Sequence, residues 1–467
     1  MKKVLCLVCA LLLALSCLTA CTPAGDPATT PNSTNPPATN GNEPAMDLKG
    51  RTIRIMYPSN WTPPDLSDET NSFAQTMKKF NCKFEFIEFT DEIAAYNGLV
   101  MSYLSGKTDY DAMIMRGYNV VPQYAASGVL LNMSDYFDFE ADGTWMDPLV
   151  SDVGVWRGDR YGFPTGPKET GYAIWYNRQY LREANLPDLW EYVEQGTWNF
   201  DTFRQVLKKL TKMENGKTTR YGFYCEDPMS SFIMANGGTF IDVSGDKAQL
   251  CIDSDESLKA MQYVVDLQNV DGSIPSAAEL EKLGNPSVLD MFMNGTVAMT
   301  AYGVWAGPLF QNNGIDPEDL GWIYFPKGED AEDYVVPGAT PKENLVIHSL
   351  VEKPEEVVAA LADAMGYWGE GKEYPRDIES AYTDTLEHDQ MLDILVGNNM
   401  TCYLEGAAKT KYTYLYNYEG IINVYGEMVT KILNNELTPK AAVDSYFSKI
   451  QSKIDKIEDG INLDDYQ

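Results

Sequence analysis

The chain of 467 residues has few of the residues and motifs that carry most enzyme chemistry. Its only histidines are His348 and His388, and beyond residue 21 no two cysteines have the Cys-x-x-Cys spacing of zinc and redox sites. The nucleophile motif Gly-x-Ser-x-Gly, the zinc motif His-Glu-x-x-His and the phosphate-binding P-loop are also absent. We therefore expect no metal, no cofactor and no catalytic residue, in a protein that is not an enzyme.

The scarcity of these motifs leaves two classes of protein open at this point. A secreted glycoside-acting enzyme needs only two carboxylates that flank one bond. Because the chain has 68 Asp and Glu residues, some carboxylates lie close together by chance, so their abundance carries little evidence. A surface adhesin or structural protein is the second alternative, and neither class is expected to have two hinged lobes.

Positive charge is also scarce, since the formal net charge is −32. Nucleic acid and anionic lipid surfaces are unfavourable partners for such a chain. A solvated acidic surface explains the charge without any ligand, and attraction of a cationic ligand is the alternative.

Cysteine is informative only at the N-terminus. Beyond residue 21 the cysteines are Cys82, Cys225, Cys251 and Cys402, which allow three pairings that the sequence cannot rank. We expect small buried apolar side chains here and leave one disulfide open.

The N-terminus has the layout of a secretory signal. A positive start, Met1–Lys3, precedes an apolar run over 4–15 that is too short to span a bilayer, and small residues follow over 16–20. Leu18-Thr19-Ala20-Cys21 resembles the bacterial lipobox, which implies that residues 1–20 are a removed signal peptide and that Cys21 carries the lipid. No second long apolar run follows, so we expect an anchored chain that does not span the membrane.

Residues 21–46 are predicted to be a lipid anchor and a disordered linker. Thr, Pro, Asn, Ala and Gly dominate the segment 22–45, which has no bulky apolar residue to offset chain entropy. The expected location is extracytoplasmic, on the outer face of the bacterial plasma membrane.

Beyond the linker, strand and helix patterns alternate, which predicts an α/β fold with largely parallel sheets. Strands are predicted at 51–57, 82–86 and 111–115. The best-marked helix covers 199–212, with Asn199 as its cap and Trp198 and Phe203 as a hydrophobic staple. Further helices are expected to begin near Ser254, Pro354, Ile421 and Thr438.

Several stretches resemble, in order, the family 1 extracellular solute-binding proteins, whose relatives include maltodextrin-binding proteins. Each motif is weak alone, and their order from about residue 50 onward carries the resemblance. The motifs are Asp109–Met115, Gly128–Asp135, Tyr161–Pro164, Tyr172–Arg178, Thr197-Trp198, Phe292–Met299 and Gly303–Trp305.

The resemblance implies a type II periplasmic-binding-protein-like fold with two lobes, a ligand cleft between them and closure by a hinge. Lobe 1 is expected to comprise residues 47–165 and 326–368, and lobe 2 residues 166–325 and 369–467. The crossings are expected near 164–170, near 325–328 and after Trp368.

The resemblance and the load of 9 Trp and 29 Tyr together predict a carbohydrate site. Aromatic planes suit the C–H faces of sugars, and carboxylates and amides suit their hydroxyl groups. The candidate ligand-binding residues are Trp61, Arg116, Tyr118, Lys168, Glu169, Tyr172, Trp175, Glu226, Asp227 and Trp305.

Each candidate also has a structural interpretation. Tyr172 and Trp175 lie on one strand, so either can belong to the core. Trp61 can cap the first lobe, and Arg116 and Lys168 can form ion pairs between the lobes without contacting ligand. Glu226 and Asp227 can form a solvated turn. Trp305, in the Gly-x-Trp element, is the strongest single candidate.

The resemblance implies a monomeric substrate-binding lipoprotein of an ABC importer. It would capture a carbohydrate, of which an oligosaccharide is favoured, and deliver it to ABC permease subunits in the membrane. A cationic or quaternary-amine ligand, held by cation–π attraction, and a peptide are the alternatives.

Overall fold

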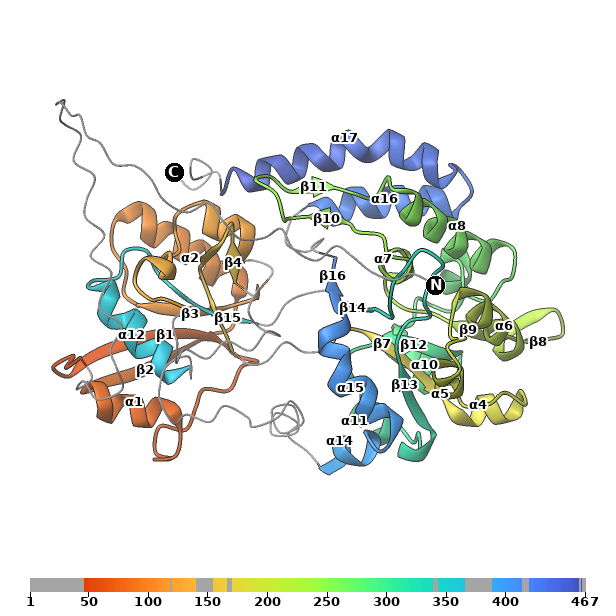
Figure 1. Cartoon of the computed structure of the whole chain (residues 1–467), viewed down its shortest axis with the longest axis horizontal. Helices are drawn as coiled ribbons and strands as arrows, with labels where there is room; N and C mark the ends of the chain where they lie inside the picture. The colour runs from red at the N-terminus through yellow and green to blue at the C-terminus, as the bar shows by residue number, and fades with distance from the viewer. Residues whose placement is uncertain are drawn as a thin grey trace, which may run out of the picture. The chain divides into compact units, whose positions relative to one another are not determined.

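The computed structural model describes residues 46–117, 120–139, 154–165, 170–338, 343–365, 389–413, 420–461 and residue 463. Within these ranges helices alternate with strands, which build two five-stranded sheets with separate apolar cores (Figure 1). This confirms the predicted α/β class. We call each sheet with its covering helices a lobe. The predicted signal peptide, Cys21 and most of the linker lie outside the described residues.

The first lobe contains a sheet in the spatial order β2-β1-β3-β15-β6. Its strands are β1 (Arg51–Pro58), β2 (Cys82–Phe89), β3 (Ala112–Met115), β6 (Phe163–Pro164) and β15 (Asn344–Ile347). β1 pairs in parallel with β2 and β3, as predicted, and β15 runs antiparallel to β3. Ile53, Ile55 and Ile114 are fully buried between the sheet and its helices, so burial of this apolar surface supplies the main stabilisation of the lobe.

Three helices and a few short elements cover this sheet. They are α1 (Ser72–Phe80), α2 (Glu92–Ser105), α12 (Pro354–Ala364), the helical turns η1 (Val120–Tyr124) and η2 (Met133–Asp135), and the hairpin β4 (Val155–Trp156) and β5 (Asp159–Arg160). The buried carboxylate of Asp363 on α12 accepts hydrogen bonds from Thr76 and from Lys79 Nζ, the latter at 2.6 Å. This joins α1 to α12 although almost 300 residues separate them in the chain.

The second lobe contains a sheet in the order β13-β7-β12-β9-β8. Its strands are β7 (Ala173–Asn177), β8 (Lys212–Glu214), β9 (Lys217–Phe223), β12 (Val297–Tyr302) and β13 (Leu320–Ile323). Only β9 and β12 pair in parallel, and the other three ladders are antiparallel. This sheet therefore has fewer parallel strand pairs than predicted. β7 runs antiparallel to both of its neighbours, β12 and β13, and β8 forms a hairpin with β9.

Helices surround the second sheet. They are α4 (Arg178–Glu183), α5 (Leu189–Glu194), α6 (Phe200–Leu210), α7 (Pro228–Ala235), α8 (Asp255–Asn269), α9 (Ala277–Lys282), α10 (Val288–Met293), α11 (Gly307–Asn312), α14 (Asp389–Ile394), α15 (Asn398–Lys409), α16 (Ile421–Leu433) and α17 (Pro439–Glu458), with the turns η3 (Val304–Ala306) and η4 (Pro317–Asp319). Two short strand pairs, β10 (Ile241–Asp242) with β11 (Gln249–Leu250) and β14 (Val336–Gly338) with β16 (Thr410–Tyr412), complete the lobe.

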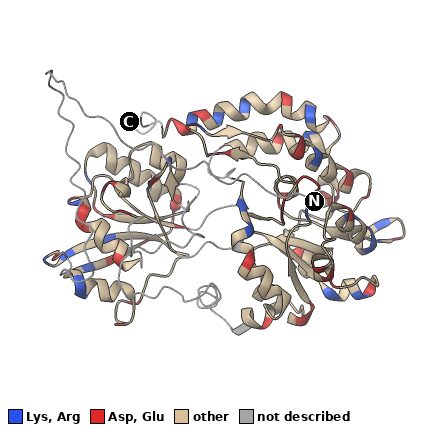
Figure 2. Cartoon of the chain, viewed as in Figure 1, with Lys and Arg blue, Asp and Glu red and all other residues tan. Residues whose placement is uncertain are grey.

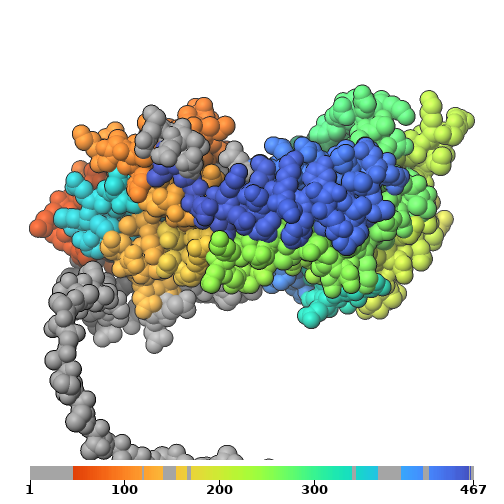
Figure 3. Space-filling view, turned by 90° about the horizontal axis from the view of Figure 1, so that it is seen from above, coloured from red at the N-terminus to blue at the C-terminus, as the bar shows by residue number. Residues whose placement is uncertain are grey.

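Helix starts follow the predicted caps. The Asn199 side chain accepts a hydrogen bond from Thr202 N at 2.9 Å, and the Trp198 and Phe203 rings pack at 5.6 Å, so α6 has the predicted cap and staple. Ser254 and Thr438 cap α8 and α17 in the same way. α17 packs on α16 and β11 (Figure 1), and the C-terminal helices form the blue surface in Figure 3. The outer surface of α17 has interspersed acidic and basic residues (Figure 2).

The chain passes three times between the two sheets. The first passage runs from β6 to β7. The second lies between β13 and β15, but Val336 is still part of the second core, so the passage follows Gly338 rather than falling at 325–328. The third joins α12 to α14 through residues outside the described ranges. Thr165 N donates to Glu343 O, and Tyr172 N donates to Pro337 O at 2.7 Å, so the first two passages are hydrogen-bonded to each other.

Cys82, Cys225, Cys251 and Cys402 are free thiols, so the disulfide left open by the sequence does not form. Three of them are buried, in keeping with their interpretation as small apolar side chains. Among the described residues, no helix is long and apolar enough to cross a bilayer.

Candidate ligand-binding site

The functional candidates of the second lobe gather at one edge of its sheet. β9 and β12 run in parallel and end there at Phe223 and Tyr302, and the antiparallel β7 begins there because Ala173 pairs with Tyr302. The loop that follows β9, the turn that follows β12 and the residue that precedes β7 therefore share this edge. Ligands of α/β proteins commonly bind outside the carboxyl ends of parallel strands.

Three aromatic side chains pack together at this edge, and we call them the aromatic cluster: Tyr172, Tyr302 and Trp305. The Tyr172 and Tyr302 rings stack at 5.4 Å with an interplanar angle of 6°, and the Trp305 ring meets Tyr302 edge-on at 5.1 Å. Trp305 is nevertheless 56% exposed. Such exposure is unusual for a tryptophan that its neighbours hold in place, and it leaves an aromatic face free for a ligand.

The packing of Trp305 explains why the Gly-x-Trp element has a glycine at position 303. A Cβ atom on Gly303 would lie 2.7 Å from Nε1 of Trp305, so any larger residue would displace the indole. Gly303 O also accepts a hydrogen bond from Trp175 Nε1 at 3.3 Å. The short element thus fixes the exposed tryptophan against the sheet edge.

Glu226 and Asp227 follow β9 at the same edge and have different environments. Glu226 is exposed. Burial, together with the negative charge of Glu226, raises the pKa of Tyr302, which places this carboxylate within electrostatic reach of the aromatic cluster. Asp227 instead caps α7, since its Oδ1 accepts a hydrogen bond from Ser230 N at 3.0 Å.

The first lobe has a corresponding edge with the candidates Trp61 and Arg116. Arg116 follows β3, and its guanidinium donates to both carboxylate oxygens of Glu92, with the Nη2 to Oε1 bond at 2.8 Å. Glu343 lies 3.7 Å from the same guanidinium. Arg116 is thus paired with acidic side chains of its own lobe, rather than with the other lobe as the structural interpretation of the sequence had it.

Trp61 follows β1 and packs on the first lobe. Its ring contacts Tyr57 at 5.8 Å and Phe86 at 6.1 Å, and its side chain is half-buried. It therefore covers the edge of the core and keeps part of its surface accessible.

The prediction that Trp175 contacts ligand is wrong. Trp175 is fully buried in the second core, where it stacks on Trp322 at 5.5 Å and meets Phe310 edge-on at 5.4 Å. The reason is its place on β7, a central strand covered on both faces, in which all five residues are buried. The other described candidates do lie at the ends of strands: Trp61, Arg116, Tyr172, Glu226, Asp227 and Trp305. Tyr118, Lys168 and Glu169 lie outside the described residues.

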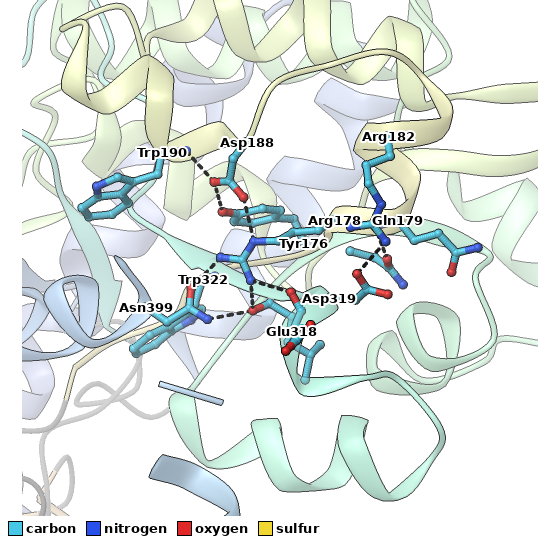
Figure 4. A network of polar contacts seen from close by, with 12 residues as sticks. Tyr176, Arg178, Gln179, Arg182, Asp188, Trp190, Glu318, Asp319, Trp322 and Asn399 are labelled. Atoms are coloured by element: carbon cyan, nitrogen blue, oxygen red, sulfur yellow. Dashed lines mark hydrogen bonds and ion pairs between the residues drawn. The ribbon is translucent and has the colours of Figure 1, made fainter. Parts of the chain in front are cut away.

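A polar network, missed by sequence reasoning, supports β7 and β13 (Figure 4). Arg178 Nε donates to Asp188 Oδ2 at 2.6 Å, and its Nη1 donates to the carbonyl of Leu320 at 2.6 Å. Tyr176 donates to the other oxygen of Asp188 at 2.7 Å. Asn399 on α15 adds hydrogen bonds to the carbonyls of Leu320 and Ile394.

This network explains Tyr176 and Arg178 of the 172–178 motif, and Asn177 between them caps α4 by accepting from Gln179 N. Asp188 lies 10 residues after Arg178 and Asn399 lies 221 residues after it, and no sequence pattern links them, so the sequence could not show the network. Tyr302, the centre of the aromatic cluster, was also missed, although it directly precedes the Gly-x-Trp element. Within the described ranges, no group of His, Cys, Asp and Glu side chains could hold a metal ion.

These features define a class of protein: two α/β lobes connected by repeated chain passages, with aromatic and carboxylate side chains at the strand edges. The sequence profile of the bacterial extracellular solute-binding proteins matches residues 82–365. The chain belongs to this family, as its motifs indicated.

Solved structures agree on the two-lobed fold of periplasmic binding proteins. The ABC substrate-binding protein Lmo0181 from Listeria monocytogenes, solved with cycloalternan, has a TM-score of 0.58 and 18% identity over 87% of this chain and 99% of its own. The GacH receptor of Streptomyces glaucescens, solved with acarbose, has a TM-score of 0.57 and 16% identity over 87% and 99%. The cyclic alpha-maltosyl-1,6-maltose binding protein from Arthrobacter globiformis has a TM-score of 0.61 and 16% identity over 87% and 100%.

Comparison with curated protein sequences finds no match. The family and the similar structures are substrate-binding proteins of transporters rather than enzymes.

Proposed function

We propose that this protein captures a carbohydrate, with an oligosaccharide favoured, for an ABC importer. The observation that carries the proposal is the aromatic cluster, in which an exposed Trp305 is held against Tyr302, at the sheet edge that also carries the loop of Glu226. An aromatic plane beside a carboxylate is complementary to a sugar, which has an apolar face and a rim of hydroxyl donors. The similar proteins solved with cycloalternan and acarbose support this ligand class.

We further propose that the two lobes close on the ligand and that the closed form delivers it to membrane permease subunits. The three chain passages between the sheets would serve as the hinge. In this proposal the lobes follow the ranges expected from the sequence, except that residues 326–338 move with lobe 2. Cys21 would carry the lipid that anchors the protein, as a monomer, to the outer face of the plasma membrane.

A cationic ligand is the second candidate. Glu226 and the aromatic cluster could hold an amine by charge and cation–π attraction, and the net charge of −32 would favour its approach. The arrangement thus suits a ligand that is neutral or positive.

A thermal-shift screen of the full chain in mild detergent tests this proposal. The library would contain mono- and oligosaccharides, polyamines, betaines and short peptides. A ligand at 100 times its Kd stabilises the native state by about 2.7 kcal/mol, which gives a clear increase in Tm. We expect a shift with saccharides of one class. A shift with amines alone would show that the ligand is an amine rather than a saccharide. Turnover of a glycoside would contradict the binding function.

A further inference from the structure

The loop after β9, residues 224–227, is anchored to the lobe by residues on both sides of Glu226. Tyr224 N donates to Met299 O at 3.2 Å and so continues the pairing of β9 with β12 for one more residue. Cys225 is buried, Glu226 is exposed, and Asp227 is turned toward α7. Glu226 is therefore the residue of this loop that projects from the lobe, with an anchored residue on each side.

Asp227 accepts hydrogen bonds from Ser230 and Ser231 of its own lobe. Its Oδ1 accepts from Ser230 N at 3.0 Å, its Oδ2 accepts from the Ser230 hydroxyl, and its main-chain carbonyl accepts from Ser231 Oγ at 2.8 Å. Burial raises the pKa of Asp227, and the hydrogen bonds from Ser230 act in the opposite direction. Both carboxylate oxygens are thus engaged within the protein.

The hydrogen bonds continue beyond Ser230 to α16. Ser230 Oγ lies 3.0 Å from the hydroxyl of Tyr425, and both residues are buried, with exposures of 2% and 4%. A serine hydroxyl has one proton, and an ionised carboxylate is only an acceptor. Ser230 therefore donates to Asp227, and Tyr425 donates to Ser230.

We infer that Asp227, Ser230 and Tyr425 form a positioning chain, which fixes the loop 224–227 and with it Glu226 at the sheet edge that carries the aromatic cluster. Asp227 is then a positioning residue rather than a ligand contact, and α16 supports the site from almost 200 residues away in the sequence. This inference rests on the proposed site but not on the identity of its ligand. Deletion of one hydroxyl in a buried chain leaves its partner unsatisfied, so the loop above it should loosen.

The first test needs no ligand. Hydrogen exchange of the full chain is compared for the wild type, Tyr425→Phe, Ser230→Ala and the control Tyr176→Phe. The control also removes a buried tyrosine hydroxyl that donates to an aspartate, at 2.7 Å, but at the far end of β7. We expect amides 224–227 to exchange at least fivefold faster in Tyr425→Phe and Ser230→Ala and to be unchanged in the control. Equal protection in all four proteins would overturn the inference.

The second test uses the saccharide that gives the largest thermal shift, titrated calorimetrically into the same four proteins. We expect at least a fivefold increase in Kd for Tyr425→Phe and Ser230→Ala, and less than twofold for Tyr176→Phe. Faster exchange without any change in Kd would show that the chain holds the loop but that the loop does not contact the ligand, which also contradicts the inference. If no saccharide binds the wild type, the proposed function fails, and the exchange result still decides whether the chain positions the loop.

Discussion

At the residue scale, two tryptophans of the second lobe have opposite environments. Trp305 is 56% exposed, whereas Trp175 is fully buried between Trp322 and Phe310. We predict that Trp305→Ala weakens saccharide binding at least tenfold and barely changes Tm without ligand. Trp175→Ala should instead cost about 3–5 kcal/mol of unfolding free energy, because it leaves a large cavity. Urea unfolding and calorimetric titration of both variants check this pair, and a stable Trp175→Ala with lost binding would reverse our assignment.

The same pair shows what the sequence could predict for single side chains. The Gly-x-Trp element pointed to Trp305 through its resemblance to the family. The structure adds the steric reason, since a Cβ atom on Gly303 would meet the indole. Trp175 lies in the five-residue strand Ala173–Asn177, which contains both apolar and polar residues. This pattern could not show that both faces of the strand are covered. For Arg116 the sequence allowed an ion pair but could not name the partners, because Glu92 and Glu343 come from other segments.

His348 gives the first lobe a pH dependence. It is 1% exposed, its Nδ1 accepts from Leu350 N at 3.0 Å, and burial lowers its pKa to about 4. The unfolded imidazole takes up a proton near pH 6.5, whereas the folded one resists until about pH 4. The contribution of neutral His348 to the unfolding free energy, about 3 kcal/mol, is fully present above pH 6.5 and is lost as the pH falls toward 4.

Urea unfolding between pH 7.5 and 4 of the wild type and His348→Asn checks this dependence. Asparagine keeps an acceptor near the position of Nδ1 but has no ionisable group. We expect the stability of the wild type to fall more steeply than that of the variant between pH 6.5 and 4. Parallel curves would show that His348 is not protonated differently in the two states.

At the element scale, the Arg178 network connects β7, α5 and α15. Arg178→Ala should lower the unfolding free energy by about 2 kcal/mol, because it leaves the partly buried Asp188 without its cation. Arg182→Ala is the matched control. Its ion pair with Asp319 spans 2.7 Å, but the arginine side chain is 62% exposed, so its loss should cost no more than about 0.5 kcal/mol. Equal losses in urea unfolding would argue against a special role for the network.

Elements with local signals were predicted well. The alternating strands at 51–57 and 82–86 and the capped helix at 199–212 form within two or three residues of their expected ends. The direction of the strands in the second sheet was not predictable, because it depends on which distant strands become neighbours. The support of the candidate site by α15 and α16 was missed for the same reason.

At the scale of the whole molecule, membrane attachment is proposed to depend on Cys21. We predict that the wild type incorporates labelled fatty acid and sediments with membranes, because a protein with two or more acyl chains stays bound. Cys21→Ser should incorporate no label and be released. Membrane association of the unlabelled variant would contradict the lipoprotein proposal while leaving the binding function untouched.

Capture of a saccharide at the aromatic cluster is the central claim about the whole protein. Calorimetric titration of the full chain with the saccharide that gives the largest thermal shift tests it most directly, in wild type and Trp305→Ala. The account predicts saturable binding to one site, intact saccharide afterwards, and at least tenfold weaker binding in the variant, equivalent to about 1.4 kcal/mol. Undiminished affinity in Trp305→Ala, or no heat with any saccharide, would contradict it.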